Sequence, residues 1–146
     1  MSAMTDYLEN KIVDWLLRGQ AFTPPATVYV GLFAAAPSDA GGGTEVTGGS
    51  YARVAVSSSL ANWAGTQAAA STVASSGTSG TTSNNAAITF PAPTANWGTV
   101  THFGVFDAST AGNLLFEAAM TTSKTINSGD AAPSFAAAAL TFQIDN

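Results

Sequence analysis

Near the start of the chain, apolar residues recur at helical spacing. Intervals of three or four residues place four of them on one stripe of a helix: Leu8, Ile12, Trp15 and Leu16. Thr5 or Asp6 can cap the start of this helix, and Gly19 after Arg18 is a typical stop. The pattern predicts an amphipathic helix over residues 5–18, with one solvated and one apolar face.

Beyond residue 25 the pattern changes to short runs of β-branched and aromatic residues separated by turn residues. Such runs predict strands, which fall at residues 26–33, 51–56, 87–90, 99–106, 114–118, 124–126 and 140–145. Residues 107–113 have the composition of a tight hairpin turn. In the last run apolar and polar residues alternate, which predicts that Leu140, Phe142 and Ile144 face the core.

Two segments lack a strand pattern. Residues 37–50 are dense in glycine, which costs too much backbone entropy for regular structure, so we expect a loop. Residues 62–85 are rich in Gly, Ser and Thr, with Trp63 and Val73 as their only large apolar groups. We expect a flexible stretch with a weak edge strand there, or a segment that orders against a partner.

Seven or eight short strands after a single helix predict a mainly β fold. A chain of 146 residues has room for one hydrophobic core. We therefore expect a single domain over residues 1–146, with the helix at 5–18 and a β-sandwich over 26–146. The jelly roll is one variant of that architecture.

Composition and charge narrow the range of partners. Charged residues make up 9% of the chain and the net charge is −5. The few basic residues are scattered, so the cluster that nucleic-acid binding requires is missing. The absence of cysteine excludes disulfides and thiolate metal sites. Acidic residues interrupt any secretory signal near the start, and no apolar run approaches the length of a membrane span, so we expect neither secretion nor a membrane partner.

The sequence offers little for catalysis. His102 is the only histidine, and any acid–base scheme would have to use it. Asp107 lies five residues further on, and two positions of opposite parity on a strand point to opposite faces. No Gly-x-Ser-x-Gly stretch supplies a nucleophile. We therefore expect His102 to be structural and predict no enzymatic activity.

Three aspartates are candidates for a cation site. Asp39, Asp107 and Asp130 each lie in a turn, where such side chains ordinarily cap the backbone. A calcium site is the alternative, but the spacing of a calcium-binding loop is missing. The glycines at 41–43 lack the Lys-Ser/Thr of a phosphate-binding loop. We predict no metal and no cofactor.

Large apolar residues are the candidates for contact with a partner: Leu8, Ile12, Trp15, Tyr51, Trp63 and Trp97. Aromatic side chains are enriched at protein interfaces, which favours packing in a core or against another protein. Aromatic faces also suit sugar rings. A platform made of Tyr51, Trp63 and Trp97 would make the protein a carbohydrate-binding adhesin, which is an alternative hypothesis.

Several motifs resemble, in order, those of a known family. The first half contains YVGLF at 29–33, APSD at 36–39, GGGTEV at 41–46 and GSYAR at 49–53. The second half contains NNAAITFP at 84–91, WGTVTHF at 97–103, FDA at 106–108, GNLLF at 112–116 and SGD at 128–130. Together they resemble the phage tail-fibre-like family of small virion structural proteins. Ala111 and residues 137–139 stand where relatives tend to carry glycine, which bears on turn geometry.

The resemblance implies a virion structural protein, assembled in the host cytoplasm. The leading hypothesis is a capsid cement or decoration protein that bridges subunits of the major capsid protein. A homo-oligomer is expected, and a trimer would suit capsid three-fold positions. The alternative is a tail-fibre or receptor-binding tail component, which would contact other virion proteins and, as an adhesin, a host-surface glycan.

Overall fold

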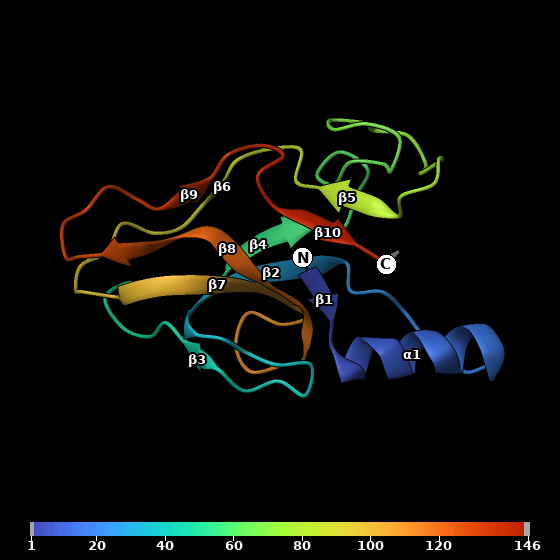
Figure 1. Cartoon of the computed structure of the whole chain (residues 1–146), viewed down its shortest axis with the longest axis horizontal. Coiled ribbons are helices and arrows are strands. Elements are labelled where there is room, and N and C mark those ends of the chain that lie inside the picture. Colours follow the sequence, from blue (N-terminus) through green and yellow to red (C-terminus); the bar gives the residue numbers. More distant parts are fainter. Residues whose placement is uncertain (1, 145–146) are drawn as a thin grey trace.

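The computed structural model describes residues 2–144, which form one helix and ten strands (Figure 1). The helix, α1, spans Asp6–Leu17. In chain order the strands are β1 (Ser2–Met4), β2 (Thr27–Ala35), β3 (Thr44–Glu45), β4 (Val54–Ser57), β5 (Thr81–Ser83), β6 (Ile88–Thr89), β7 (Gly98–Phe106), β8 (Leu114–Ile126), β9 (Ser134–Phe135) and β10 (Thr141–Gln143). The fold is mainly β with one N-terminal helix, as the sequence predicts.

Six strands form one antiparallel sheet, in the order β1-β8-β7-β2-β3, with β4 also paired to β2. The strands β3 and β4 share one edge of β2. Along that edge β4 pairs with residues 27–30 of β2, and β3 pairs with Phe33 and Ala35. On this edge Leu32 of β2 therefore lies between the two paired stretches, while its other edge pairs with Phe103 of β7.

Two ribbons of two strands each, β5–β10 and β6–β9, pack on one face of this sheet. Aromatic rings join the layers. Phe103 of β7 lies 5.6 Å from Phe135 of β9 and 5.9 Å from Phe142 of β10, measured between ring centroids. The layers thus resemble a sandwich, but the strands do not divide into the two four-stranded sheets of a jelly roll.

The helix begins and ends where the sequence predicts, although its start is held differently. The Thr5 hydroxyl donates to the carbonyl of Leu114, and it makes no cap hydrogen bond to the helix. At the other end Gly19 adopts a φ of +67°, the left-handed conformation typical of a helix stop. The start of α1 is therefore tied to β8, while its end is free of the sheet.

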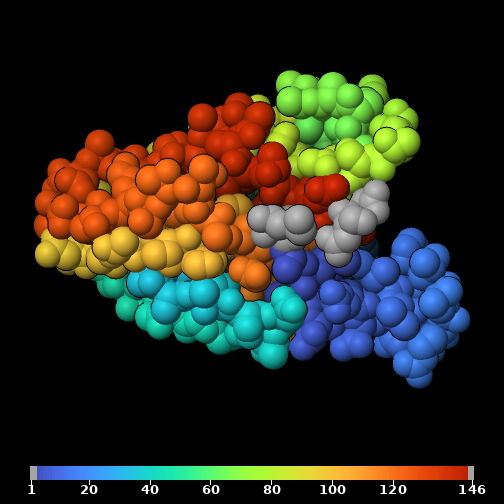
Figure 2. Space-filling model, in the orientation of Figure 1, coloured from blue at the N-terminus to red at the C-terminus, as the bar shows by residue number. Residues whose placement is uncertain are grey.

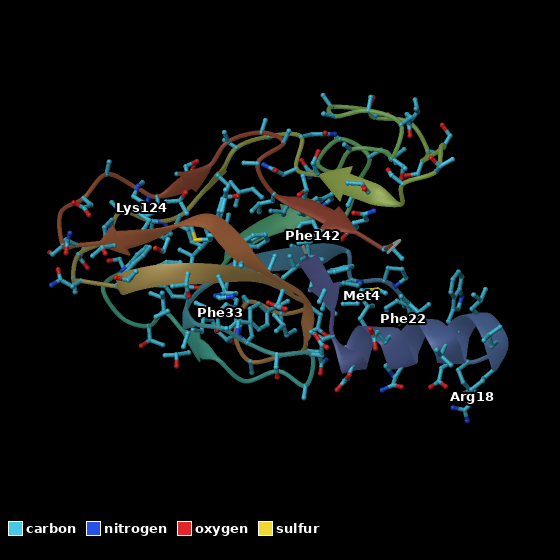
Figure 3. The ribbon with its side chains drawn as sticks, in the orientation of Figure 1. Met4, Arg18, Phe22, Phe33, Lys124 and Phe142 are labelled. Atoms are coloured by element: carbon cyan, nitrogen blue, oxygen red, sulfur yellow. The ribbon has the colours of Figure 1, made fainter. Side chains whose placement is uncertain are left out.

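Only the first half of the predicted apolar stripe is buried. Leu8 is 8% exposed and Ile12 is half-buried, whereas Trp15 is 56% and Leu16 is 66% exposed. The reason is that α1 extends beyond the end of the sheet, and Arg18 lies at its far tip (Figures 1 and 3). An amphipathic pattern shows which face is apolar but not whether another element covers it.

Three further predictions about strands need correction. The glycine-rich segment 37–50 contains the short strand β3, and β1 forms where no strand is expected. Ile144 is 61% exposed, although Leu140 and Phe142 are buried as predicted. At Ile144 the chain has passed the edge of the packed layers, so the alternation of apolar and polar residues no longer predicts which side chain is buried. Asp145, which belongs to the same predicted strand, lies outside the described residues.

Most of segment 62–85 is irregular, but side chains fix its course. The amide of Gln67 donates to Ser71 Oγ and accepts from the backbone N–H of Ser76. Asn84, 1% exposed, donates to the carbonyls of Ala86 and Ala136, and its Oδ1 accepts from the backbone N–H of Leu140. One asparagine thereby joins this segment to the chain that leads into β10.

The strand β8 joins two runs that the sequence separates, and it contains a large bulge. Val100 of β7 faces Lys124, while His102 faces Ala119, so one residue of β7 stands opposite four of β8. On its other side β8 pairs with β1 only at residues 116–118. Within the described chain, residues 119–126 of β8 thus form an open but distorted edge.

The turns where relatives tend to carry glycine are unusual. Ala111 has a φ of +50° and Ala138 a φ of +61°, which an L-residue with a side chain adopts only with strain. Both alanines therefore keep a conformation that glycine adopts without cost. At these two positions an alanine therefore adopts a φ that is typical of glycine.

No helix within residues 2–144 is long and apolar enough to cross a membrane.

Candidate functional site

A buried arginine ties three parts of the chain together. The Nε and Nη2 of Arg53 donate to the two carboxylate oxygens of Glu45 at 2.8 and 2.7 Å, a bidentate pair. Its Nη1 donates to the carbonyls of Ala108 and Ala111, both at 2.8 Å, and its guanidinium lies 3.3 Å from the ring centroid of Phe106. The side chain is only 7% exposed. Arg53 thus connects β3 to the turn between β7 and β8 through hydrogen bonds.

Tyr51 completes this network and fills the gap along β2. Its hydroxyl accepts a hydrogen bond from the backbone N–H of Leu32 at 2.8 Å and donates to Glu45 Oε1 at 2.9 Å. Burial raises the pKa of Tyr51 well above its ordinary value, so the phenol remains a donor. The Tyr51 hydroxyl therefore takes the place of a strand partner between β3 and β4.

A glycine allows this close approach. A Cβ on Gly31 would lie 3.0 Å from Glu45 Oε1 and 3.1 Å from the Tyr51 hydroxyl. We call Glu45, Tyr51 and Arg53 the buttress. The GGGTEV and GSYAR motifs contain these three residues, so the structure gives the motifs a supporting role within the fold.

Three polar turns meet at the end of the molecule opposite α1 (Figure 1): residues 47–50, 93–97 and 127–130. They hydrogen-bond to one another. Ser50 Oγ lies 2.9 Å from Thr94 Oγ1, the Ser128 N–H donates to Asn96 Oδ1, and Trp97 Nε1 donates to the Gly49 carbonyl. We call this region the turn end. Its polar groups are largely satisfied within the chain.

Exposed large apolar side chains gather at the other end. Seven stand out in the described chain, and they come from α1, from residues 58–83 and from the last residues: Val13, Trp15, Leu16, Leu17, Leu60, Val73 and Ile144. Figure 2 shows α1 in blue and residues 58–83 in green as two lobes toward the same end. We call these two lobes and Ile144 the apolar end.

One of the lobes carries a groove. It has a volume of about 620 Å³ and is lined by Leu60, Trp63, Ala64 and Ile144 together with serine, threonine and glycine residues. None of its lining residues is charged. The segment 58–82 that supplies most of the lining belongs to a neutral stretch, because no Asp, Glu, Lys or Arg lies between Arg53 and Asp107. Asp145 follows Ile144 in the sequence and lies outside the described residues. The described lining thus offers an apolar group a surface without a charge.

The six predicted contact residues are divided between the interior and the surface. Leu8 and Trp97 are buried, while Ile12, Tyr51 and Trp63 are half-buried; Trp15 is the most exposed of the six. Tyr51 and Trp97 pack edge to face, 5.3 Å apart, whereas Trp63 packs against Phe142. The three rings considered for a sugar platform therefore do not form one surface.

Each candidate catalytic or cation-binding residue has its own hydrogen-bond partner within the chain. His102 Nδ1 is 2.9 Å from Thr101 Oγ1, while the Asp107 carboxylate accepts from the backbone and side chain of Asn113. Asp130 accepts from the N–H of Asn127. The backbone carbonyl of Asp39 accepts a hydrogen bond from the backbone N–H of Asp6. Residues 2–144 contain no group of three or more acidic or histidine side chains placed to hold a metal ion.

One carboxylate on the sheet face opposite the ribbons is electrostatically distinct. Burial raises the pKa of Glu117, and the nearby charge of Asp39 raises it further, while His102 lowers it. Glu117 is half-buried and faces Gly104 across the β7–β8 pair. The charges of Glu117 and His102 thus influence each other across the β7–β8 pair.

The sequence analysis missed the buttress. Glu45 and Arg53 have opposite charges, and Arg53 is the last charged residue before a long neutral stretch. A lone arginine at the start of an apolar strand is a signal for a buried ion pair, because an unpaired charge there would be costly. The sequence could not show which carboxylate pairs with it.

Comparison with known proteins identifies the family. A family model described as "Podophage GP4 fiber I protein gp80" matches residues 3–143, almost the whole chain. No curated protein matches. The match confirms the resemblance to phage tail-fibre-like virion proteins and the predicted location in the virion, and it supports a fibre better than capsid cement. The chain belongs to the family of the podophage GP4 fiber I protein gp80.

Proposed function

We propose that the protein is a non-enzymatic structural subunit of a phage fibre that attaches to other virion proteins through its apolar end. The observation that carries this proposal is the position of the exposed large apolar side chains, which all belong to α1, residues 58–83 or Ile144. Soluble monomers rarely expose contiguous apolar surface, and such surface commonly marks a protein interface.

The chemistry of the two ends supports this assignment. Interface cores are depleted in charge and enriched in aromatic residues, and the apolar end has a neutral groove beside Trp63 and an exposed Trp15. The turn end instead satisfies its polar groups internally. In this arrangement the apolar end faces the particle and the turn end faces outward.

Localisation on the particle separates a fibre from capsid cement. Antibody raised against the purified protein and coupled to gold would label intact particles for electron microscopy. We expect label on fibres at the tail. Label distributed over the head would instead restore the capsid-cement hypothesis and contradict the fibre.

A matched pair of charge variants tests the attachment surface. Leu17→Glu places a charge on the most exposed apolar residue of α1, and Ala131→Glu places the same charge in the exposed turn after β8. In particles from cells that supply only the variant, we expect Leu17→Glu to be lost from the particle and Ala131→Glu to be retained. Equal incorporation of both variants would refute attachment through the apolar end.

A further inference from the structure

We propose that the Arg18–Gly19 peptide bond is a processing site, where a protease that cuts after basic residues severs the unattached chain. Attachment to the particle through the apolar end then covers this bond. The first part rests on the structure of the chain itself, and the second part rests on the proposed function. The sequence limits the choice of bond, because only four peptide bonds follow a lysine or an arginine: those after Lys11, Arg18, Arg53 and Lys124.

Three of these four bonds lie within packed elements. Lys11 is half-buried inside α1, and the next residue, Ile12, packs against the main core. Arg53 is 7% exposed and is hydrogen-bonded within the buttress. Lys124 lies in β8, where it is paired with Val100 of β7. A protease binds its substrate as an opened segment, so a cut at any of these three bonds requires part of the core or the sheet to unfold first.

The bond after Arg18 lies in exposed chain. The Arg18 side chain is 69% exposed at the far tip of α1, and residues 15–21 are all exposed (Figure 3). Apart from its chain neighbours, no atom of the described chain would lie within 4 Å of a Cβ on Gly19, so a protease has room on this side of the bond. Residues 18–26 belong to neither a helix nor a strand. Exposed irregular chain of this kind is where proteases preferentially cut folded proteins.

Few contacts hold the last turn of α1 in place. The backbone carbonyl of Asp14 accepts hydrogen bonds from the N–H groups of Arg18 and Gln20, at 3.2 and 3.0 Å, and the Asp14 carboxylate pairs with Arg18. An exposed ion pair adds little stability. Leu16 and Leu17 are already 66% and 77% exposed, so unwinding this turn uncovers hardly any further apolar surface. The turn can therefore open for a protease without disturbing the sheet.

The reaction is a hydrolysis. Water adds across the amide, the bond between the Arg18 carbonyl carbon and the Gly19 nitrogen breaks, and the products are a carboxylate on Arg18 and an amino group on Gly19. Residues 1–18 then remain bound only through the β1–β8 pair, the hydrogen bonds of Thr5 and side chains such as the buried Leu8. Cleavage thereby breaks the covalent link between α1 and β2. A protease of this specificity would disable subunits that are not attached and spare those that are.

Trypsin, which cuts after lysine and arginine, tests the first part on the purified folded chain. We expect an initial cut into residues 1–18 and 19–146, identified by mass spectrometry. Arg18→Gln should lose intact chain at least about tenfold more slowly, because its remaining bonds require unfolding. Lys124→Gln is the matched control, since it also removes one exposed positive charge, and it should be cut as fast as the unaltered chain. A first cut at another bond, or an Arg18→Gln chain cut at the unaltered rate, would overturn the proposal.

Intact particles test the second part. Trypsin is added to purified particles and to the free chain at the same subunit concentration, and antibody against the protein measures the chain that remains intact. We expect the particle-bound chain to be cut after Arg18 at least about tenfold more slowly, because only detached subunits expose the bond.

The outcomes separate this inference from the proposed function. If the free chain is not cut first after Arg18, the processing site is wrong and the attachment surface is unaffected. If the free chain is cut there and the particle-bound chain is cut equally fast, the apolar end is open on the particle. That second result would overturn the proposed attachment together with the second part of this inference, and would leave the processing site in place.

Discussion

Two arginine–carboxylate pairs with similar shortest N–O distances lie in very different regions of the molecule. Arg53 and Glu45 in the buttress are 2.7 Å apart, and the arginine side chain is 7% exposed. Arg18 and Asp14 at the apolar end are 2.6 Å apart, and the arginine side chain is 69% exposed. A buried pair loses far more when one partner is removed than an exposed pair does. Distance alone therefore does not show what a pair contributes.

This difference in burial suggests that the buttress stabilises the fold, whereas the apolar end is available for contact with a partner. Around the buttress, polar groups find their partners within the chain, so this region holds the fold together without help. At the apolar end, large apolar groups remain in contact with water, so this region can gain from a partner. Substitutions in the two regions should accordingly change different properties.

The largest expected effect comes from removing the buried arginine. Arg53→Ala leaves the Glu45 carboxylate without its cation and two turn carbonyls without their donor, and it should lower the free energy of unfolding by about 3–5 kcal/mol. Arg18→Ala is the matched control and should lower it by less than about 1 kcal/mol. Urea unfolding followed by tryptophan fluorescence measures both. Similar losses would remove the distinction between the two regions.

Removing one hydroxyl tests the gap along β2. Tyr51→Phe leaves the N–H of Leu32 without an acceptor and should cost about 1–3 kcal/mol. Tyr29→Phe removes a hydroxyl from β2 itself, and the described chain supplies no hydrogen bond for that hydroxyl. This variant should leave the free energy of unfolding nearly unchanged. Amide hydrogen exchange at Leu32 should accelerate in the first variant only. Unchanged exchange would show that the hydroxyl is not a strand substitute.

Relieving the strained turn beside the buttress should stabilise the protein. Ala111 has a φ of +50°, so Ala111→Gly should raise the free energy of unfolding by up to about 1 kcal/mol. The control is Ala108→Gly in the same turn, where φ is not positive and glycine should cost about 0.5–1 kcal/mol. Thermal unfolding measures whether each variant is more or less stable than the unaltered protein. A loss in both variants would show that Arg53, and not backbone strain, dominates this turn.

The smallest effect on stability is expected at the apolar end. Trp15 is 56% exposed, and Trp15→Ser should change the free energy of unfolding by no more than about 0.5 kcal/mol. The same change should reduce the amount of the protein that is incorporated into particles. Trp97→Ser is the contrasting variant, because Trp97 is buried and its loss should cost about 3–5 kcal/mol. A strongly destabilised Trp15→Ser protein would place that tryptophan inside the fold.

Local signals in the sequence predict local structure well. The start and end of α1 follow from its cap residues and from Gly19, and the β7–β8 hairpin follows from the turn residues between Asp107 and Asn113. Each signal acts within a few residues, although at the start of α1 the Thr5 hydroxyl bonds to Leu114 of β8 and does not cap the helix. The class of fold and the resemblance to fibre proteins could therefore be predicted from the sequence.

Features that depend on distant partners could not be predicted in the same way. The strand β3 forms in a glycine-rich segment because β2 offers it an edge, and the short β1 forms because β8 does. Ile144 and Leu16 have the periodicity of core residues but lie beyond the packed layers. Periodicity identifies a face of an element, whereas burial depends on how far the neighbouring elements extend.

The open edge of β8 has a consequence wherever two copies of this chain meet in solution. A long flat edge would let two sheets zip together through their backbones, the first step toward insoluble aggregates. The bulge opposite Thr101 breaks the regular spacing of donors and acceptors along that edge, and Lys124 adds a charge that a joining strand would have to bury. Sheet-to-sheet polymerisation is thereby disfavoured, and the choice of contact is left to side chains.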